Sequence, residues 1–274
     1  MEATVIKQIE LSGLFHKYSL EWNLNDDVNI LVGINGSGKS TLLRCINALL
    51  SREYSYLKWM GVDITALLSD NERIAYTKKG IVNPANATIN YEYITTFDVP
   101  LKDKRSLGKS ESPLDKELQS IVYTIGSSRR SFSNYRFKAT NYPKTAGIIN
   151  DRIRRLFKLI DKLFAQTEKT IAIDPDDNQL VFHKDDSVIQ LEELSSGEKQ
   201  LLIIVFTVFL MEEEPYVLLM DEPEISLHIE WQQNLIEVIR KLNPNCQLIM
   251  ATHSPSIFGK GWGDKMFFIE DLFK

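Results

Sequence analysis

Apolar and polar positions follow short repeating patterns at the start of the chain. Residues 5–11 are β-prone, residues 18–24 alternate loosely before an Asn-Asp-Asp turn, and residues 28–32 form a short, mostly apolar run. Such segments, bounded by turn residues, predict strands. After a glycine-rich turn the apolar spacing changes to three and four, which predicts a helix. Its apolar face carries Leu42, Leu43, Ile46 and Leu49.

The second half of the chain alternates predicted strands and helices. A hairpin-like stretch covers residues 169–188, with turn residues at 174–178. Strands are predicted at residues 91–99, 216–220, 247–251 and 266–269, and helices at residues 196–212 and 229–242. Strands that alternate with helices imply an α/β fold with a mostly parallel sheet covered on both faces.

The middle of the chain differs in charge from the rest. Residues 102–169 have a net charge of +9, within a protein whose net charge is −5. An asymmetry of this size predicts a basic helical lobe, residues 101–169, inserted in a core of residues 1–100 and 170–274. Ser112 and Pro113 are typical of a helix start. Residues 149–164 carry apolar side chains at spacings of three and four, which predicts a second, amphipathic helix.

Composition limits the class of protein. The 274 residues are 43% hydrophobic and 25% charged, which is ordinary for a globular domain. The two cysteines provide no disulfide framework, and no Cys/His cluster has zinc spacing. The longest apolar run, residues 201–211, is too short to span a bilayer, and residues 1–4 lack the pattern of a secretion signal. We expect a soluble cytoplasmic protein that makes no membrane contact.

Residues 33–40 fit the phosphate-loop pattern G-x-x-x-x-G-K-[ST], between an apolar strand and a helix. Backbone N–H groups of such a loop wrap phosphates, and the helix N-terminus adds positive potential. We expect Lys39 to reach the β- and γ-phosphates of ATP, and the Ser40 hydroxyl to ligate Mg²⁺. The full set of predicted nucleotide-binding residues in this loop is Asn35, Gly36, Ser37, Gly38, Lys39, Ser40 and Thr41.

Three further elements carry candidate chemistry. Asp221 and Glu222 end an apolar strand; Asp221 suits a metal shell, and Glu222 is placed to accept a proton from an attacking water. His253 follows another apolar strand, where it can hydrogen-bond a γ-phosphate. Ser195 and Glu198 form a capping box before a helix. The same geometry leaves N–H groups and the serine hydroxyl free to meet an anion.

These elements in this order resemble the ATP-binding-cassette (ABC) ATPases. Residues 194–198, Leu-Ser-Ser-Gly-Glu, stand where that superfamily has its signature Leu-Ser-Gly-Gly-Gln. The wording of residues 221–228 and 251–255 narrows the match to the OLD and RecF-like branch, which contains many "AAA family" ATPases of bacterial defence systems. The resemblance implies a P-loop NTPase fold of ABC type and hydrolysis of ATP with Mg²⁺.

The resemblance also implies shared sites. Ser195 and Gly197 would contact the γ-phosphate held by a second subunit, and residues 225–228 would cross the dimer seam. A homodimer or higher homo-oligomer is therefore expected, acting as an ATP-driven switch or clamp on a separate effector protein. The glutamine that usually couples core and lobe is missing near residues 95–98, where Asp98 is the candidate substitute. Phe15, Lys17 and Tyr18 are candidate adenine contacts.

Two alternatives stay open. The ATPase subunit of a membrane transporter would share the fold, although the acid-rich wording of residues 222–228 argues against it. A DNA-repair or nucleic-acid clamp is the other, although no sustained heptads predict long coiled-coil arms. Arg129, Arg130, Arg136 and Lys138 interleave with Phe132, Tyr135 and Phe137, and Arg155, Lys158 and Lys162 line the adjacent helix. This basic lobe could bind nucleic acid or an acidic protein partner.

Overall fold

The computed structural model describes residues 3–83, 87–95, 112–125 and 130–274. The chain divides into two compact units. The first unit comprises Met1–Thr96, Glu213–Ile225 and Gln232–Lys274. The second unit comprises Phe97–Glu212 and Ser226–Trp231.

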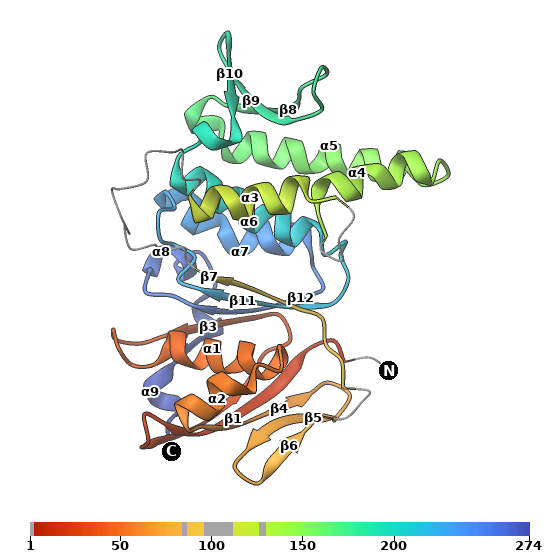
Figure 1. The fold of residues 1–274 in the computed structure, drawn as a ribbon. Coiled ribbons are helices and arrows are strands. Elements are labelled where there is room, and N and C mark those ends of the chain that lie inside the picture. Colours follow the sequence, from red (N-terminus) through yellow and green to blue (C-terminus); the bar gives the residue numbers. More distant parts are fainter. Residues whose placement is uncertain (1–2, 84–86, 96–111, 126–129) are drawn as a thin grey trace, which may run out of the picture. The chain divides into compact units, whose positions relative to one another are not determined.

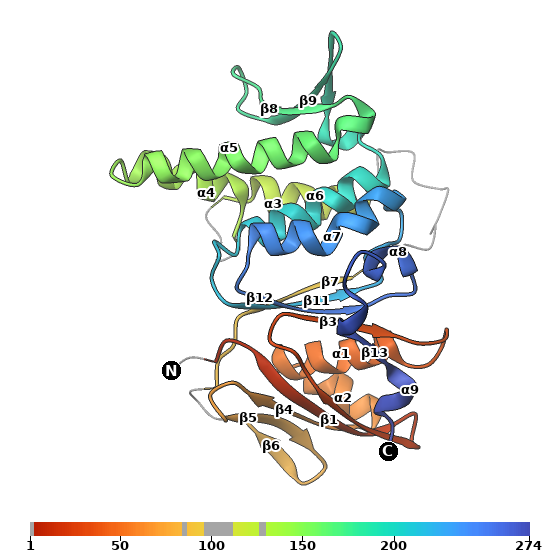
Figure 2. The same cartoon turned by 180° about the vertical axis from the view of Figure 1, so that it is seen from behind.

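A parallel sheet forms the centre of the first unit. Its order is β13 (Met266–Phe268), β3 (Val28–Val32), β12 (Cys246–Ala251), β11 (Tyr216–Asp221) and β7 (Tyr91–Thr95), and all four pairings are parallel. Every residue of β3, β11 and β12 is buried, as expected for strands covered on both faces. Helix α1 (Lys39–Leu50) lies on one face, and α7 (Ile229–Leu242), from Gln232 onward, lies on the other (Figures 1 and 2).

A second, antiparallel sheet belongs to the same unit. Its order is β2 (Tyr18–Asn23), β1 (Ile6–Leu14), β4 (Asp63–Leu68), β5 (Arg73–Thr77) and β6 (Gly80–Val82). Alternate residues of β4 are buried, because one face packs on the core and the other meets water. Helices α1 and α2 (Tyr54–Met60) lie between this sheet and the parallel one (Figure 1).

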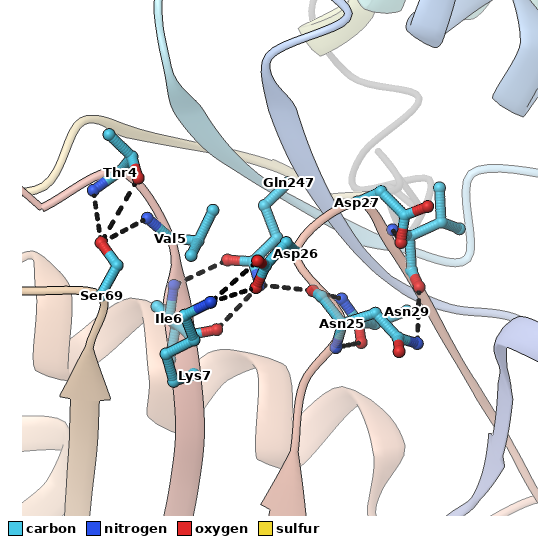
Figure 3. A network of polar contacts seen from close by, with 11 residues as sticks. Thr4, Val5, Ile6, Lys7, Asn25, Asp26, Asp27, Asn29, Ser69 and Gln247 are labelled. Carbon is cyan, nitrogen blue, oxygen red and sulfur yellow. Dashed lines mark hydrogen bonds and ion pairs between the residues drawn. The ribbon is translucent and has the colours of Figure 1, made fainter.

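Buried side-chain amides join the two sheets of the first unit (Figure 3). Gln247 of β12 is fully buried; its Oε1 accepts from the Ile6 N–H at 2.8 Å. Its Nε2 donates to the carbonyl oxygens of Ile6 and Asn25, both at 2.8 Å. Asn29, also fully buried, accepts from Asn25 N at 2.7 Å and donates to its carbonyl at 2.9 Å. The amides thus provide hydrogen-bond partners for backbone N–H and C=O groups that are not paired within the sheets.

The second unit is a helical lobe with a small sheet. Its helices are α3 (Pro113–Tyr123), α4 (Phe132–Asn141), α5 (Ala146–Leu163) and α6 (Ser196–Phe209). Its antiparallel strands are β8 (Thr170–Ile173), β9 (Leu180–Lys184) and β10 (Ser187–Gln190), and β8 contacts the end of α5. Phe132 of α4 packs edge-on against Phe206 of α6, and Tyr135 packs against Phe209. Aromatic side chains therefore hold the helices together.

Short elements complete the chain. In the second unit these are the 3₁₀ turns η1 (Ala165–Thr167) and η2 (Leu191–Glu193). In the first unit they are α8 (Pro255–Phe258), η3 (Gly263–Lys265) and α9 (Ile269–Leu272). Both cysteines are buried in the first unit. In the described ranges no helix combines the length and apolarity that crossing a membrane requires.

The predicted fold class, a mostly parallel α/β sheet flanked by helices with an inserted helical lobe, is confirmed. Two details differ from the expectations. The second unit runs past residue 169 to Glu212, because β8 to β10 and α6 pack with the lobe helices. Helix α4 was not predicted, because only Phe132 and Tyr135 of its ten residues are buried, which leaves little periodic signal.

Candidate functional site

The phosphate loop connects β3 to α1 at the carboxyl end of the parallel sheet. Gly36 and Gly38 have φ angles of 79° and 104°, which side chains rarely adopt, and Gly38 is the residue before the helix. The loop therefore exposes backbone N–H groups at a helix N-terminus, which is the arrangement that binds phosphates. Asn35 and Gly36 are exposed, and Thr41 follows in the first turn of α1.

Lys39 is almost fully buried, with 3% of its surface exposed. Its Nζ donates to the carbonyl oxygens of Gly33 and Ile34, both at 3.0 Å. Burial lowers the pKa of Lys39, while nearby carboxylates, Glu222 first among them, act in the opposite direction. The ammonium group is held inside the loop by neutral carbonyls and has no carboxylate bonded to it in the described chain, so it can receive a phosphate oxygen.

Ser40 and Asp221 meet beside the loop. The Ser40 hydroxyl donates to Asp221 Oδ1 at 2.7 Å, from the first turn of α1 to the last residue of β11. Burial raises the pKa of Asp221, and the hydrogen bond from Ser40 only partly opposes it. A buried carboxylate whose charge is not fully compensated is stabilised by a cation.

Glu222 and His253 lie together at the ends of the neighbouring strands β11 and β12. His253 Nε2 is 3.4 Å from Glu222 Oε1, and both side chains are about one-third exposed. Glu222 has a φ of 49°, a left-handed conformation that is uncommon for a side-chain-bearing residue. Strain of this kind concentrates at functional sites.

Glu224 fixes the segment that carries His253. Its Oε1 accepts from the Thr252 hydroxyl at 2.7 Å, from His253 N at 2.7 Å and from Ser254 N at 3.2 Å. Glu224 stands in the same acidic motif as Asp221 and Glu222, but nothing in its sequence context predicts this role. Three bonds to one oxygen make Glu224 the residue that orients the loop.

The signature segment, residues 194–198, belongs to the second unit, whereas the residues above belong to the first. Ser195 precedes α6 and forms the predicted capping box. We expected its hydroxyl to be free to meet an anion, but the hydroxyl donates to Glu198 Oε2 at 3.0 Å and accepts from Glu198 N at 3.3 Å. Gly197 packs so tightly that a Cβ there would lie 2.2 Å from the Ser226 carbonyl oxygen.

Other residues singled out in the sequence differ in their surroundings. Phe15, which is 47% exposed, lies against Gly38: a Cβ on that glycine would be 3.0 Å from its ring. Tyr18 instead stacks on Phe273, with ring centroids 4.7 Å apart, and Lys17 lies over the Tyr18 ring. Asp98, the candidate coupling residue, lies outside the described residues, as does Arg129.

The residues present fit a magnesium nucleotide. The Ser37 hydroxyl of the loop is buried and has no hydrogen-bond partner within the described chain, so it lacks the bond a phosphate oxygen could supply. Mg²⁺ is usually held by one or two protein oxygens plus substrate phosphates, as Ser40 and Asp221 allow. Among the described residues no cluster of three or more His, Cys, Asp or Glu forms an all-protein metal site.

Comparison with known proteins identifies the family. Residues 104–259 match the family described as "AAA domain, putative AbiEii toxin, Type IV TA system". This match covers more than half of the chain, including the signature segment, Asp221, Glu222 and His253. The chain belongs to this AAA-domain family.

Proteins similar in sequence to this chain support its place in the AAA-domain family. The Septu protein PtuA of Bacillus thuringiensis is 24% identical over 92% of this chain and 72% of its own length. The Retron Vc95 probable ATPase of Vibrio cholerae is 21% identical over 80% of this chain and 48% of its own length. The chain therefore spans about half the length of the retron ATPase.

A solved structure gives the same fold. An SMC head bound to the C-winged helix domain of ScpA is 13% identical and has a TM-score of 0.54. The match covers 93% of this chain and 91% of that one. It confirms the predicted ABC-type P-loop fold. The family match and the Septu and retron relatives confirm the resemblance to the OLD/RecF-like branch. Membership in a P-loop ATPase family implies use of a nucleotide and, usually, of Mg²⁺.

Proposed function

We propose that the chain is an ATP-hydrolysing switch that dimerises around ATP and controls a separate effector in bacterial anti-phage defence. One observation carries the proposal. Lys39, the Ser40–Asp221 pair and the Glu222–His253 pair converge at the carboxyl end of one parallel sheet. Ligands of open α/β sheets bind at that edge. The relatives of the Septu and retron types support the biological setting.

The chain's own residues divide the work of binding. The N–H groups from Asn35 to Thr41 would cradle the phosphates, with Lys39 against the β- and γ-phosphates. Ser40 and Asp221 would hold Mg²⁺, which supplies positive charge against the phosphate oxygens when bound. Phe15, beside Gly38, is the favoured adenine contact because its exposed ring offers a face for stacking.

Hydrolysis would depend on Glu222. Its carboxylate would accept a proton from the attacking water, and His253, 3.4 Å away, would orient that carboxylate and hydrogen-bond the γ-phosphate. Glu224 would keep His253 in place through the three bonds to its loop.

The decisive experiment compares two variants in phosphate-release and ATP-binding assays. We expect Glu222→Gln to bind Mg·ATP with near wild-type affinity and to lose at least about a hundredfold in turnover, because only the base is removed. Lys39→Ala should lose ATP binding itself. Wild-type turnover by Glu222→Gln would contradict the assignment of the base.

Dimerisation is the second part of the proposal. Because each site would lack Ser195 and Gly197 until a second copy closes over it, turnover should rise steeply with protein concentration. In sedimentation experiments, Glu222→Gln should form dimers only with ATP. Ser195→Arg in that background should remain monomeric while still binding ATP. An ATP-saturated Glu222→Gln monomer would contradict the shared site.

The basic face of the lobe is the proposed effector contact. Arg155, Lys158 and Lys162 are exposed on α5 and make no ion pair in the described part of the chain. Of the three aromatics interleaved with basic residues, Phe132 and Tyr135 are buried among core aromatics and cannot stack on bases, and only Phe137, 49% exposed, offers a ring face. This favours an acidic protein partner over single-stranded nucleic acid.

The test replaces Arg155, Lys158 and Lys162 with glutamate. We expect loss of effector binding, with ATP turnover within about twofold of wild type because these exposed side chains lie outside the catalytic residues. The variant is also assayed for DNA and RNA binding. Loss of nucleic-acid binding with effector binding intact would refute the preference.

A further inference from the structure

The signature segment contains a carboxylate where the superfamily pattern has a neutral amide. Glu198 is 3% exposed, and it lies in the first turn of α6, three residues after Ser195. Its Oε2 accepts from Ser195 N at 2.8 Å and from the Ser195 hydroxyl at 3.0 Å. Any phosphate that meets Ser195 therefore approaches a buried negative charge. Two negative charges that are close together and shielded from bulk water repel each other strongly.

Lys169 supplies the compensating charge. Its Nζ lies 2.7 Å from Glu198 Oε1, and the two side chains are 15% and 3% exposed. Burial alone would raise the pKa of Glu198, but the hydrogen bonds from Lys169 and Ser195 lower it overall, so the carboxylate is ionised. The adjacent Lys199 does not contribute to this pair, because its Nζ binds Asp115 and the Glu192 carbonyl, each at 2.6 Å.

The position of Lys169 is set by the end of the lobe helix α5. It lies between η1 and β8, and its N–H contacts the Phe164 carbonyl at 3.5 Å. Phe164 is fully buried and stacks on Phe182 at 4.9 Å. Trp231 Nε1 donates to the Leu163 carbonyl at 2.7 Å. The lysine is thus held by packed contacts, so a shift at the end of α5 would move it relative to Glu198.

We propose that Lys169 is a positioning residue that neutralises Glu198, so that the signature segment can accept the γ-phosphate of ATP bound by a second copy of the chain. This inference rests on the proposed function. When phosphate arrives, the Ser195 hydroxyl exchanges its bond to Glu198 Oε2 for a bond to phosphate. Glu198 keeps its bonds to Lys169 and to Ser195 N. The lobe thereby sets whether the signature segment is competent to close the dimer.

The test uses the Glu222→Gln background, in which hydrolysis is slow and ATP-dependent dimers accumulate. Variants Lys169→Met, Lys169→Arg, Glu198→Gln and the double variant Lys169→Met with Glu198→Gln are compared. Lys184→Met is the matched control, since Lys184 forms a more exposed ion pair with Glu168 at 3.4 Å in the same unit. Dimerisation with Mg·ATP is measured by sedimentation, binding of Mg·ATP by calorimetry, and folding by thermal melting.

We expect Lys169→Met to weaken ATP-dependent dimerisation at least tenfold while ATP affinity stays within twofold, because the phosphate loop is untouched. Lys169→Arg, Glu198→Gln, the double variant and Lys184→Met should stay within about threefold of the background, because none leaves an unpaired carboxylate in the segment. The return of dimerisation in the double variant is the diagnostic result. A purely structural contact would leave it as weak as Lys169→Met.

Unchanged dimerisation by Lys169→Met would overturn the inference, as would a double variant that dimerises no better than Lys169→Met. If Lys169→Met does not fold, the comparison rests on Glu198→Gln: a loss of at least tenfold there overturns the inference, and retained dimerisation supports it. Failure of the Glu222→Gln background itself to dimerise with ATP would instead overturn the proposed function, and this inference with it.

Discussion

The amide of Gln247 provides a sharp test of how the two sheets of the first unit are joined. Replacing it with leucine keeps a similar volume but removes an acceptor and two donated bonds. The Ile6 N–H and the carbonyl oxygens of Ile6 and Asn25 would each lose a partner at 2.8 Å. The Gln247 side chain that makes these three bonds is fully buried (Figure 3).

The expected cost follows from these three bonds. A typical intramolecular hydrogen bond contributes about 1 kcal/mol net, and a buried group left without a partner costs about 1–3 kcal/mol. Gln247→Leu should therefore lower the free energy of unfolding by about 3 kcal/mol, and by more if the backbone groups left behind find no other partner. With a urea m-value of about 3 kcal/mol/M, the midpoint would fall by about 1 M.

Urea unfolding followed by circular dichroism measures this loss. Gln8→Leu is the matched control: Gln8 Nε2 also donates two bonds, to Glu21 at 2.8 Å and Asn23 at 2.9 Å, but its side chain is only partly buried, so water can replace the amide. We expect the control to lose less than about 1 kcal/mol. Equal losses in the two variants, or a loss under about 1 kcal/mol for Gln247→Leu, would refute the reasoning.

Three further predictions concern the site. Burial raises the pKa of Asp221, and only the ionised carboxylate ligates a cation. Mg²⁺ affinity, measured by titration from about pH 8 to pH 4, should therefore start to fall at a higher pH than for an ordinary aspartate, whose pKa is about 3.9. Asp221→Asn should abolish this pH dependence. Glu224→Gln should lower turnover about tenfold or more with ATP affinity unchanged, because the loop of His253 loses a charged acceptor of three bonds; unaltered turnover would show that the charge is dispensable. Gly197→Ala should destabilise the protein by about 1–3 kcal/mol in thermal melts, because its Cβ would lie 2.2 Å from the Ser226 carbonyl oxygen; an unchanged melting temperature would contradict that packing.

Some parts of the fold are legible in the sequence because their causes are local. The apolar runs of β3, β11 and β12 follow from burial on both faces, and α7 begins and ends at the predicted residues. Helix α4 was missed because Phe132 and Tyr135, which face the aromatic core, are its only buried residues. The same aromatics alternate with basic residues, a pattern that left both nucleic acid and an acidic protein as candidate partners of the lobe. The burial of Phe132 and Tyr135 removes these two rings as faces on which bases could stack.

The candidate site likewise contains residues that a local motif predicts and residues that only long-range contacts reveal. The phosphate loop and the Asp221–Glu222 pair could be predicted, because their chemistry lies within a few consecutive residues. The roles of Glu224 and Lys169 could not, because each acts through contacts about 30 residues away along the chain. No periodicity or short motif records such contacts; only the packed structure brings the groups together.

The two thiols make the protein convenient for labelling. Cys45 and Cys246 are fully buried, and burial raises the pKa of each to about 12. At pH 8 the thiolate, which is the form that reacts with maleimides, would be about one part in ten thousand of each native thiol. A single cysteine introduced on an exposed surface, such as Lys158→Cys on α5, should therefore take up a fluorophore or spin label selectively without first removing the native cysteines. Pairs of such labels would report, in real time, the distance between two copies of the lobe as ATP is added and consumed.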